Sequence, residues 1–562
     1  MKRLSLAIFV LLAATPVLAQ STKESLASLI EAGNRKAALD RIRAGADVNE
    51  AQPDGTRPIH WAVYRVDYEL LGALIAKKAS LNVRNEFGSM PIAQAAELAD
   101  AKMVKMLLDA GAEPEGANPD GQTALMLAIK TGEVPVVEML IKAGANVNTV
   151  EKFHKQTPLM WAAGAQRNGG AMVKLLLAKG ADVKPRALYT DWPSQITSEP
   201  RAQYRPVGGL TALLYAARDG CYDCVEALLG AGADVNMPTP EGVTALMLAL
   251  DNDHNDVAKL LLDRGANPNL WDWWGRTALY IVIDRKETLS ASQGGRGARG
   301  TRAPVTRGDS RPALSSMDII KALLAADVDL NAQINFHRPS RGGNSGRFID
   351  PLLNTGCTPL LRATMAGDSE VVRALLAKGA DPNINDMGLT PFLVAAGVGA
   401  GNRGGTGLAA QSSAGGPVNM ELMELLVQHG ADVNAQVTGT FTYSMRVSRA
   451  PSANEGKTAL HIAAETGKPD LVRYLLQKGA NTEIVDAGGK KAIDLVSATS
   501  RGGGNAPPAA TGNSAATQAA ATPSAGAPAP EGGSPADGKV NPASMAEIRS
   551  LLENATSKAR AR

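Results

Sequence analysis

A glycine recurs at a fixed interval of 33 residues in two stretches of this chain, at Gly55, Gly88 and Gly121 and again at Gly209, Gly242 and Gly275. One phrase recurs around these glycines, most fully as DGQTALMLAIKTGEVPVVEMLIKAGANVN (120–148), EGVTALMLALDNDHNDVAKLLLDRGANPN (241–269) and EGKTALHIAAETGKPDLVRYLLQKGAN (455–481). A fixed period of this length is the signature of a repeat architecture. Each unit is too small to bury its own apolar face, so it must stack on its neighbours.

Each copy of the phrase predicts two short helices. A threonine stands where an N-cap hydroxyl would accept from free amides of the first helix, at Thr123, Thr157, Thr211, Thr244, Thr277, Thr358, Thr390 and Thr458. Proline follows directly at Pro158, Pro359 and Pro391, the first helical position, where no N–H is missed. Apolar residues then recur at helical spacing, and Gly144 marks the end of a second helix.

The phrase resembles the ankyrin repeat, with its G-x-T-P-L-H-x-A-A, G-x-x-x-V-V-x-L-L and G-A-D-V-N segments, over most of residues 22–500. The resemblance implies an all-α ankyrin-repeat solenoid of about twelve helix-turn-helix units with short β-hairpin fingers and loop insertions. The first unit (22–53) and the last (489–500 with 542–556) depart from the phrase, as end caps that meet water should. Arg57 and Met90 replace the capping threonine of two early helices, which predicts that those helices are locally weaker.

The first 19 residues have the design of a secretory signal peptide. Lys2 and Arg3 precede an apolar run too short to span a bilayer, and Val17-Leu18-Ala19 offers a small-residue cleavage site. We therefore expect cleavage after Ala19 and an exported protein, periplasmic or secreted, with no membrane insertion afterwards. The formal charge of +3 would then fall to +1, which argues against nucleic acid as the partner.

Insertions interrupt the solenoid (20–500) in two kinds of place. Three lie in fingers, the connections between one repeat and the next, at 188–207, 336–354 and 436–454. Three lie between the two helices of a repeat, at 287–313, 398–417 and 501–541. The second set is rich in Gly, Ala, Pro and Ser without aromatics, so the sequence predicts disorder, most clearly for a 501–541 linker. Residues 542–562 are expected to form a C-terminal capping helix and tail.

Aromatic residues gather in the fingers, although the whole chain is only 4% aromatic. The finger insertions carry Tyr189, Trp192, Tyr204, Phe336, Phe348, Phe441 and Tyr443, and one finger of ordinary length carries Trp271, Trp273 and Trp274. Such rings either pack on one another as a structural cluster or anchor a partner, since interfaces concentrate their binding energy in buried aromatics. The sequence leaves both readings open.

No catalytic or metal-binding constellation stands out. His60 and His461 occupy the histidine of the repeat phrase, for which the resemblance implies local hydrogen bonding. Cys221 and Cys224 form a C-x-x-C that could be a local disulfide, two buried thiols or a redox pair, while Cys357 lies three repeats away. We expect no cofactor and no metal.

The sequence therefore predicts a non-catalytic scaffold, expected to be monomeric, that binds a protein or peptide on its concave, finger-lined face. Its signal peptide and repeats look like those of bacterial exported ankyrin proteins. Two alternatives remain: an envelope glycan-binding protein that uses the finger aromatics, and a thiol-redox protein that uses residues 221–224.

Overall fold

The computed structural model describes eight stretches of the chain, residues 24–190, 207–293, 313–334, 356–385, 388–398, 418–438, 454–496 and 541–560. These residues divide into two compact units. Unit 1 comprises residues 1–190 and 208–234, and unit 2 comprises residues 191–207 and 235–562.

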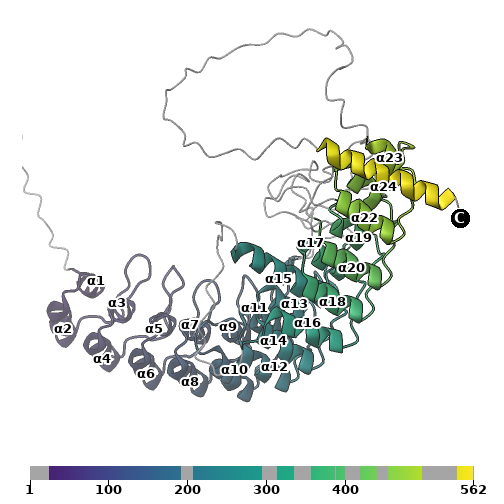
Figure 1. The fold of residues 1–562 in the computed structure, drawn as a ribbon. Helices are drawn as coiled ribbons and strands as arrows, with labels where there is room; N and C mark the ends of the chain where they lie inside the picture. The colour runs from purple at the N-terminus through teal and green to yellow at the C-terminus, as the bar shows by residue number, and fades with distance from the viewer. Residues whose placement is uncertain are drawn as a thin grey trace, which may run out of the picture. The chain divides into compact units, whose positions relative to one another are not determined.

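Unit 1 consists of six antiparallel helix pairs. Its helices are α1 (Leu26–Glu31), α2 (Arg35–Arg43), α3 (Pro58–Tyr64), α4 (Tyr68–Ala76), α5 (Pro91–Glu97), α6 (Ala101–Asp109), α7 (Ala124–Thr131), α8 (Val134–Lys142), α9 (Pro158–Ala163), α10 (Gly169–Ala178), α11 (Ala212–Asp219) and α12 (Tyr222–Gly230). The odd-numbered helices pack in one row and the even-numbered helices in a second, as the early helices in Figure 1 show.

Unit 2 continues the same pairing. Its helices are α13 (Ala245–Asp251), α14 (Asn255–Asp263), α15 (Ala278–Gln293), α16 (Ser316–Ala325), α17 (Pro359–Ala366), α18 (Ser369–Ala377), α19 (Pro391–Ala395), α20 (Met420–Gln428), α21 (Ala459–Glu465), α22 (Pro469–Gln477), α23 (Ala492–Leu495) and α24 (Pro542–Arg560). Helix α15 extends to Gln293, so the first part of the insertion expected at 287–313 is helical rather than loop. The long α24 packs on α22 and α23.

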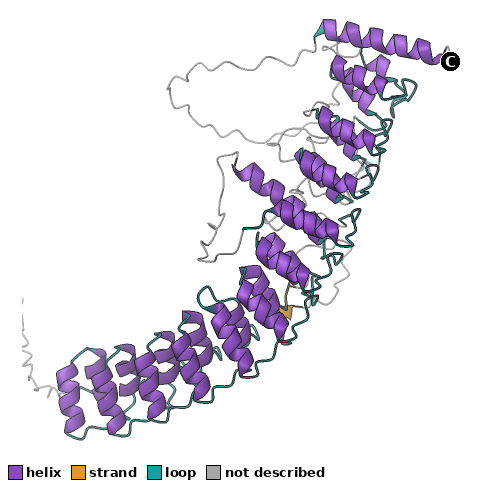
Figure 2. Cartoon of the chain, turned by 60° about the horizontal axis from the view of Figure 1, so that its bottom comes forward, coloured by secondary structure: helices purple, strands orange, loops and turns teal. Residues whose placement is uncertain are grey.

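Helices dominate the described residues, as Figure 2 shows, and the all-α prediction is confirmed. The two strands found there, β1 (Tyr189–Thr190) and β2 (Val207–Gly208), form one small sheet. Other fingers close with a single antiparallel bridge, at Ala117–Thr123, Trp271–Thr277, Gln436–Thr458 and Val485–Lys491. Among the described helices, none combines the length and the apolar content that a membrane span requires.

The threonine caps form as the sequence predicts. In all eight repeats the threonine hydroxyl accepts from the amide three residues on, at Thr123, Thr157, Thr211, Thr244, Thr277, Thr358, Thr390 and Thr458. Pro158, Pro359 and Pro391 each occupy the first turn. Arg57 and Met90 form no side-chain cap of this kind, because neither side chain has a hydroxyl or carboxylate oxygen that could accept from the helix amides. These caps fix where each first helix begins.

The core follows the apolar stripes of the phrase. Leu125, Ala128, Val137 and Leu140 are completely buried between neighbouring helices of unit 1. In unit 2, Tyr280 joins Ile334, Cys357, Leu361 and Val394 in a buried cluster. Burial of this kind is the main favourable term in the stability of each unit.

A ladder of asparagines links successive repeats at the base of the fingers. The side-chain oxygen of the last asparagine in each G-A-D-V-N segment accepts from a backbone amide in the next segment. In unit 2 these pairs are Asn236–Asn267, Asn269–Asp329, Asn331–Asp381, Asn383–Asp432 and Asn434–Asn481, with distances of 2.7, 2.7, 3.0, 2.7 and 2.7 Å. The ladder therefore keeps its geometry where the paired residues are 31 positions apart and where they are 60 apart.

Candidate partner-binding surface

The tryptophan-rich finger of unit 2 turns two of its rings toward solvent. Trp271 is 62% exposed and Trp273 is 39% exposed. The backbone beneath them is fixed, because Trp271 forms the bridge to Thr277 and the Trp273 amide donates to the Glu241 carbonyl over 2.7 Å. Both rings thus stand on an ordered turn.

A buried carboxylate organises this turn. Asp272 is completely buried, and its Oδ1 accepts from the amides of Trp274 and Arg276 at 3.0 and 2.9 Å. The Gly275 amide donates to the Asp272 carbonyl, with Gly275 in the left-handed region at φ 76°. An Asp that caps its own turn is a common way to fix such a connection.

Arg276 holds the ring of the third tryptophan, Trp274, against the turn. The buried guanidinium donates to Asp272 and, through both terminal nitrogens, to Asp251 at 3.0–3.1 Å. Burial disfavours the charge of Arg276, but the two carboxylates outweigh this effect and raise its pKa. The guanidinium carbon also lies 5.2 Å from the centre of the Trp274 ring, within the range of a cation–π contact. The Trp274 ring is therefore part of the turn's structure.

Tyr189 lies in unit 1, on β1, and is 47% exposed. The preceding Leu188 is also exposed, and its amide donates to the His154 carbonyl on the adjacent finger. Because Tyr189 and the tryptophans belong to different units, we describe them as two separate surfaces. The other finger aromatics singled out from the sequence, Trp192, Tyr204, Phe336, Phe348, Phe441 and Tyr443, lie outside the described residues.

The sequence reading missed Phe153, which is 59% exposed at the tip of the finger between α8 and α9. Phe87, at the tip of an earlier finger, is exposed to a similar degree. Their position in the sequence could have indicated their exposure. Both stand just before the residues that open the next helix, where the phrase usually has small or polar residues.

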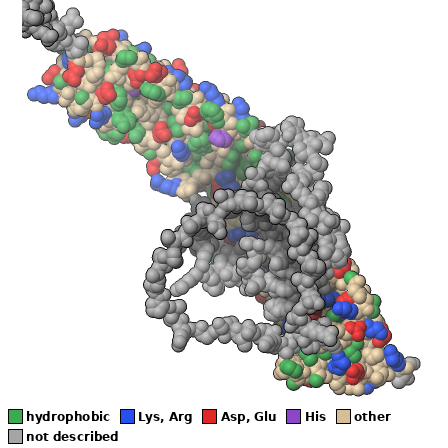
Figure 3. All heavy atoms as spheres, turned by 90° about the horizontal axis from the view of Figure 1, so that it is seen from above, with side chains coloured by type: hydrophobic (Ala, Val, Ile, Leu, Met, Phe, Trp, Pro, Cys, Tyr) green, Lys and Arg blue, Asp and Glu red, His purple; other side chains and the backbone are tan. Residues whose placement is uncertain are grey.

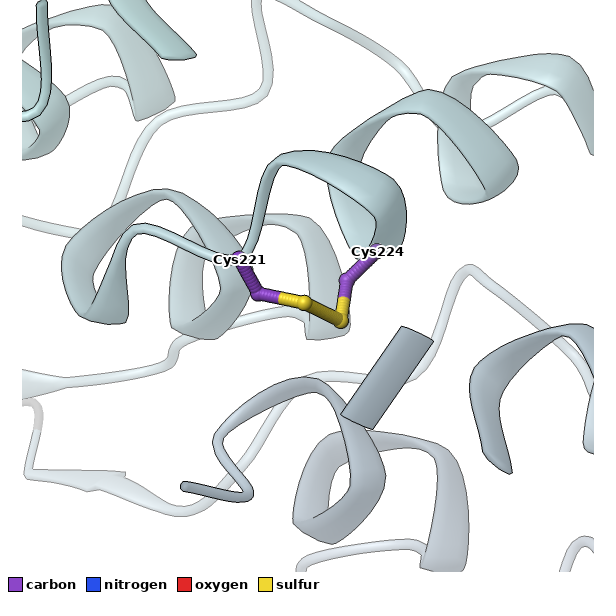
Figure 4. The surroundings of a disulfide bond; sticks show 2 residues. All are labelled: Cys221 and Cys224. Atoms are coloured by element: carbon purple, nitrogen blue, oxygen red, sulfur yellow. A yellow bond between two sulfur atoms is a disulfide. The ribbon is translucent and has the colours of Figure 1, made fainter. Parts of the chain in front are cut away.

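Cys221 and Cys224 are joined by a disulfide at the start of α12 (Figure 4). Cys224 is completely buried. A Cβ atom added at Gly169, on α10, would lie 3.3 Å from its sulfur, so the bond packs closely on the neighbouring repeat. Cys357 is reduced and buried in the Tyr280 cluster.

His60 and His461 each bond a carbonyl of the next finger, at Ser89 and Lys490. The described part of the chain contains no group of three His, Cys, Asp or Glu side chains placed to hold a metal ion. On the face that Figure 3 shows, acidic, basic and apolar side chains are interspersed.

Comparison with known proteins places this geometry in a family. The profile "Ankyrin repeats (3 copies)" matches residues 92–187, 195–289 and 389–486, and the profile "Ankyrin repeat" matches 355–387. Protein phosphatase 1 regulatory subunit 27 from Homo sapiens and its counterpart from Mus musculus are each 33% identical to this chain over 91 residues. The match covers 16% of this chain and 49% of each relative, so the chain spans about half the length of these curated relatives.

Proposed function

Since the chain belongs to the ankyrin-repeat family, we propose that it is a non-catalytic scaffold whose fingers bind a protein or peptide partner. The observation that carries the proposal is the pair Trp271 and Trp273, two large exposed rings on an ordered turn. Rigid aromatic side chains bind at low entropic cost, because little backbone or side-chain freedom is lost.

The relatives support the class of activity. Their name describes a regulatory subunit of a phosphatase, a protein that acts through another protein. This similarity supports a protein-binding role for the present chain, and the experiment below identifies the partner. Proteins of one fold can bind many different partners, so the choice of partner depends on the exposed residues of the individual chain.

We further propose that the protein acts after export, as a monomer in a periplasm or outside the cell. The support is the basic, apolar and small-residue order of residues 1–19. The intact mass of the chain recovered from the envelope fraction tests this, since removal of those residues leaves Gln20 at the N-terminus.

The test of the scaffold is affinity capture from the native envelope fraction with the wild-type chain and with W271A/W273A. We expect the double variant to lose the captured partner while its helicity and melting temperature stay unchanged, because both rings are exposed. Trp274 is left intact because it packs on Arg276. The matched control is L98A/M420A, which removes two exposed apolar side chains, one at the end of α5 and one on α20.

Equal capture by W271A/W273A and wild type would overturn the assignment to this finger. Unfolding of the double variant would show instead that the rings are structural. A glycan panel read by tryptophan fluorescence tests the carbohydrate alternative: a response that W271A/W273A abolishes would assign the surface to carbohydrate.

A further inference from the structure

Two adjacent fingers of unit 1 form a surface that is both basic and apolar. They comprise residues 150–155, between α8 and α9, and residues 184–189, which follow α10 and end in β1. We propose that this basic finger surface binds an acidic peptide segment that carries an apolar side chain. The inference rests on the proposed scaffold function and specifies the chemistry of one partner.

The first finger is held in shape by a buried carboxylate. Glu151 is 1% exposed, and its oxygens accept from the amides of Phe153, His154 and Gln156. Lys155 takes a left-handed conformation at φ 55° to complete the turn. The Glu151 carboxylate is therefore occupied by backbone amides and is not accessible to a cationic partner.

The same turn directs its remaining side chains outward. Lys152, Phe153, His154 and Lys155 are all exposed. Lys152 donates to the Pro119 carbonyl on the preceding finger over 3.2 Å, which places its charge between the two fingers. An ordered turn that exposes one aromatic ring between cationic side chains presents an anchor with charges on both sides.

The second finger adds the same two properties. Leu188 and Tyr189 are exposed, and the Leu188 amide donates to the His154 carbonyl over 2.6 Å, so the two fingers are directly bonded. Lys184 is exposed nearby in the chain, and Arg186 donates to the Gly209 carbonyl. The exposed apolar residues therefore lie on two directly bonded fingers.

The excess of positive charge on the two fingers indicates the charge of the partner. Within 150–155 and 184–189 the cations are Lys152, Lys155, Lys184 and Arg186, whereas the one carboxylate, Glu151, is buried. The flanking carboxylates are Asp120 and Glu115, the latter accepting from the Thr149 hydroxyl, and Asp182, which accepts from the Lys184 amide. The cations outnumber these, so an acidic segment is attracted and a basic one is repelled.

The experiment measures fluorescence anisotropy of short labelled peptides with the full chain. Three peptides share a central Leu-Trp pair and differ in flanking residues: Asp and Glu, Ser and Gln, or Lys and Arg. The variants are K152E/K155E and F153A. The control K142E/K174E reverses two exposed lysines on α8 and α10 and makes the same change in net charge.

We expect the acidic peptide alone to bind, with affinity that falls as salt is raised. K152E/K155E should weaken it about tenfold or more, F153A should also weaken it, and the control should not. Preference for the neutral or basic peptide, or full affinity in both variants, would overturn the proposal. Capture that depends on Trp271 and Trp273 while the acidic peptide fails to bind would sink this inference and leave the scaffold function standing.

Discussion

Single histidines connect neighbouring repeats in both units. In the neutral ring of His461, Nδ1 accepts from the Thr458 amide at 3.2 Å, so Nε2 carries the proton and donates to the Lys490 carbonyl at 3.1 Å. His60 makes the same two contacts, with the Arg57 amide and the Ser89 carbonyl. A protonated ring has no lone pair left at Nδ1, so only the neutral form satisfies both groups.

Acid should therefore weaken these repeats. Burial lowers the pKa of His60 and of His461 below the ordinary value of 6.5. The unfolded chain then binds protons that the native chain does not, so this part of the stability is full above about pH 6.5 and is lost as the pH falls toward the native pKa. Urea unfolding between pH 7.5 and pH 5, values chosen to bracket about 6.5, should show a shallower pH dependence for H461Q. Identical pH dependence in H461Q and wild type would contradict this account.

At the scale of the element, the start of the first helix in a repeat is stabilised by its N-cap, and a finger is stabilised by hydrogen bonds from a side chain to the amides of its own turn. Helix α3 begins at Pro58 after Arg57, whose side chain has no acceptor for the free amides. The equivalent Thr458 of α21 accepts from the His461 amide. The two helices share the histidine contact and differ in the hydroxyl.

Supplying the hydroxyl should strengthen α3. R57T recreates the Thr458–His461 arrangement, and we expect it to stabilise the helix by about 1 kcal/mol, the usual value of such a cap. Hydrogen exchange of the α3 amides measures the change. M90T is the instructive control: Met90 is buried, so its substitution also removes packing and should bring no net gain. Unchanged or faster exchange in R57T would show that the cap is not what limits α3.

The capping threonines, the helix pairs and the buried stripes could all be predicted from the sequence, because each depends on residues close together in one phrase. The finger surfaces could not. Arg276 reads as an ordinary turn residue until Asp251, 25 positions earlier, is seen beside it. Phe153 stands in a turn shaped by Glu151, which accepts from the amide five residues on, whereas Asp272 in its own finger accepts from the amide four residues on. Contacts that belong to a single repeat carry no periodic signal.

At the scale of the whole molecule, stability is a sum over neighbouring helix pairs, and the end of unit 2 needs a cover. Helix α24 provides it: Ile548 and Leu552 are buried where α24 packs on α22 and α23. Arg473 of α22 also pairs with Glu547. The last pair is thus completed by a helix from beyond the 501–541 segment.

Removing those two side chains should loosen the end of unit 2 first. We expect I548A and L552A each to cost about 2–5 kcal/mol, as large-to-small core changes do, with the losses non-additive because the sites are neighbours. Hydrogen exchange should quicken in α22 and α23 and stay unchanged in α1–α6. E553A, an exposed change on the same helix, is the control. Uniform acceleration across the chain would refute neighbour-limited stability.

The asparagine ladder has a consequence for how this protein can change over generations. Asn269 reaches Asp329 and Asn236 reaches Asn267 at the same 2.7 Å, although the first pair encloses almost twice as much chain. Lengthening an enclosed loop costs free energy only logarithmically. Segments between the rungs can therefore be gained, lost or exchanged between lineages while the stack keeps its pitch. A laboratory graft of a foreign domain between two rungs exploits the same tolerance.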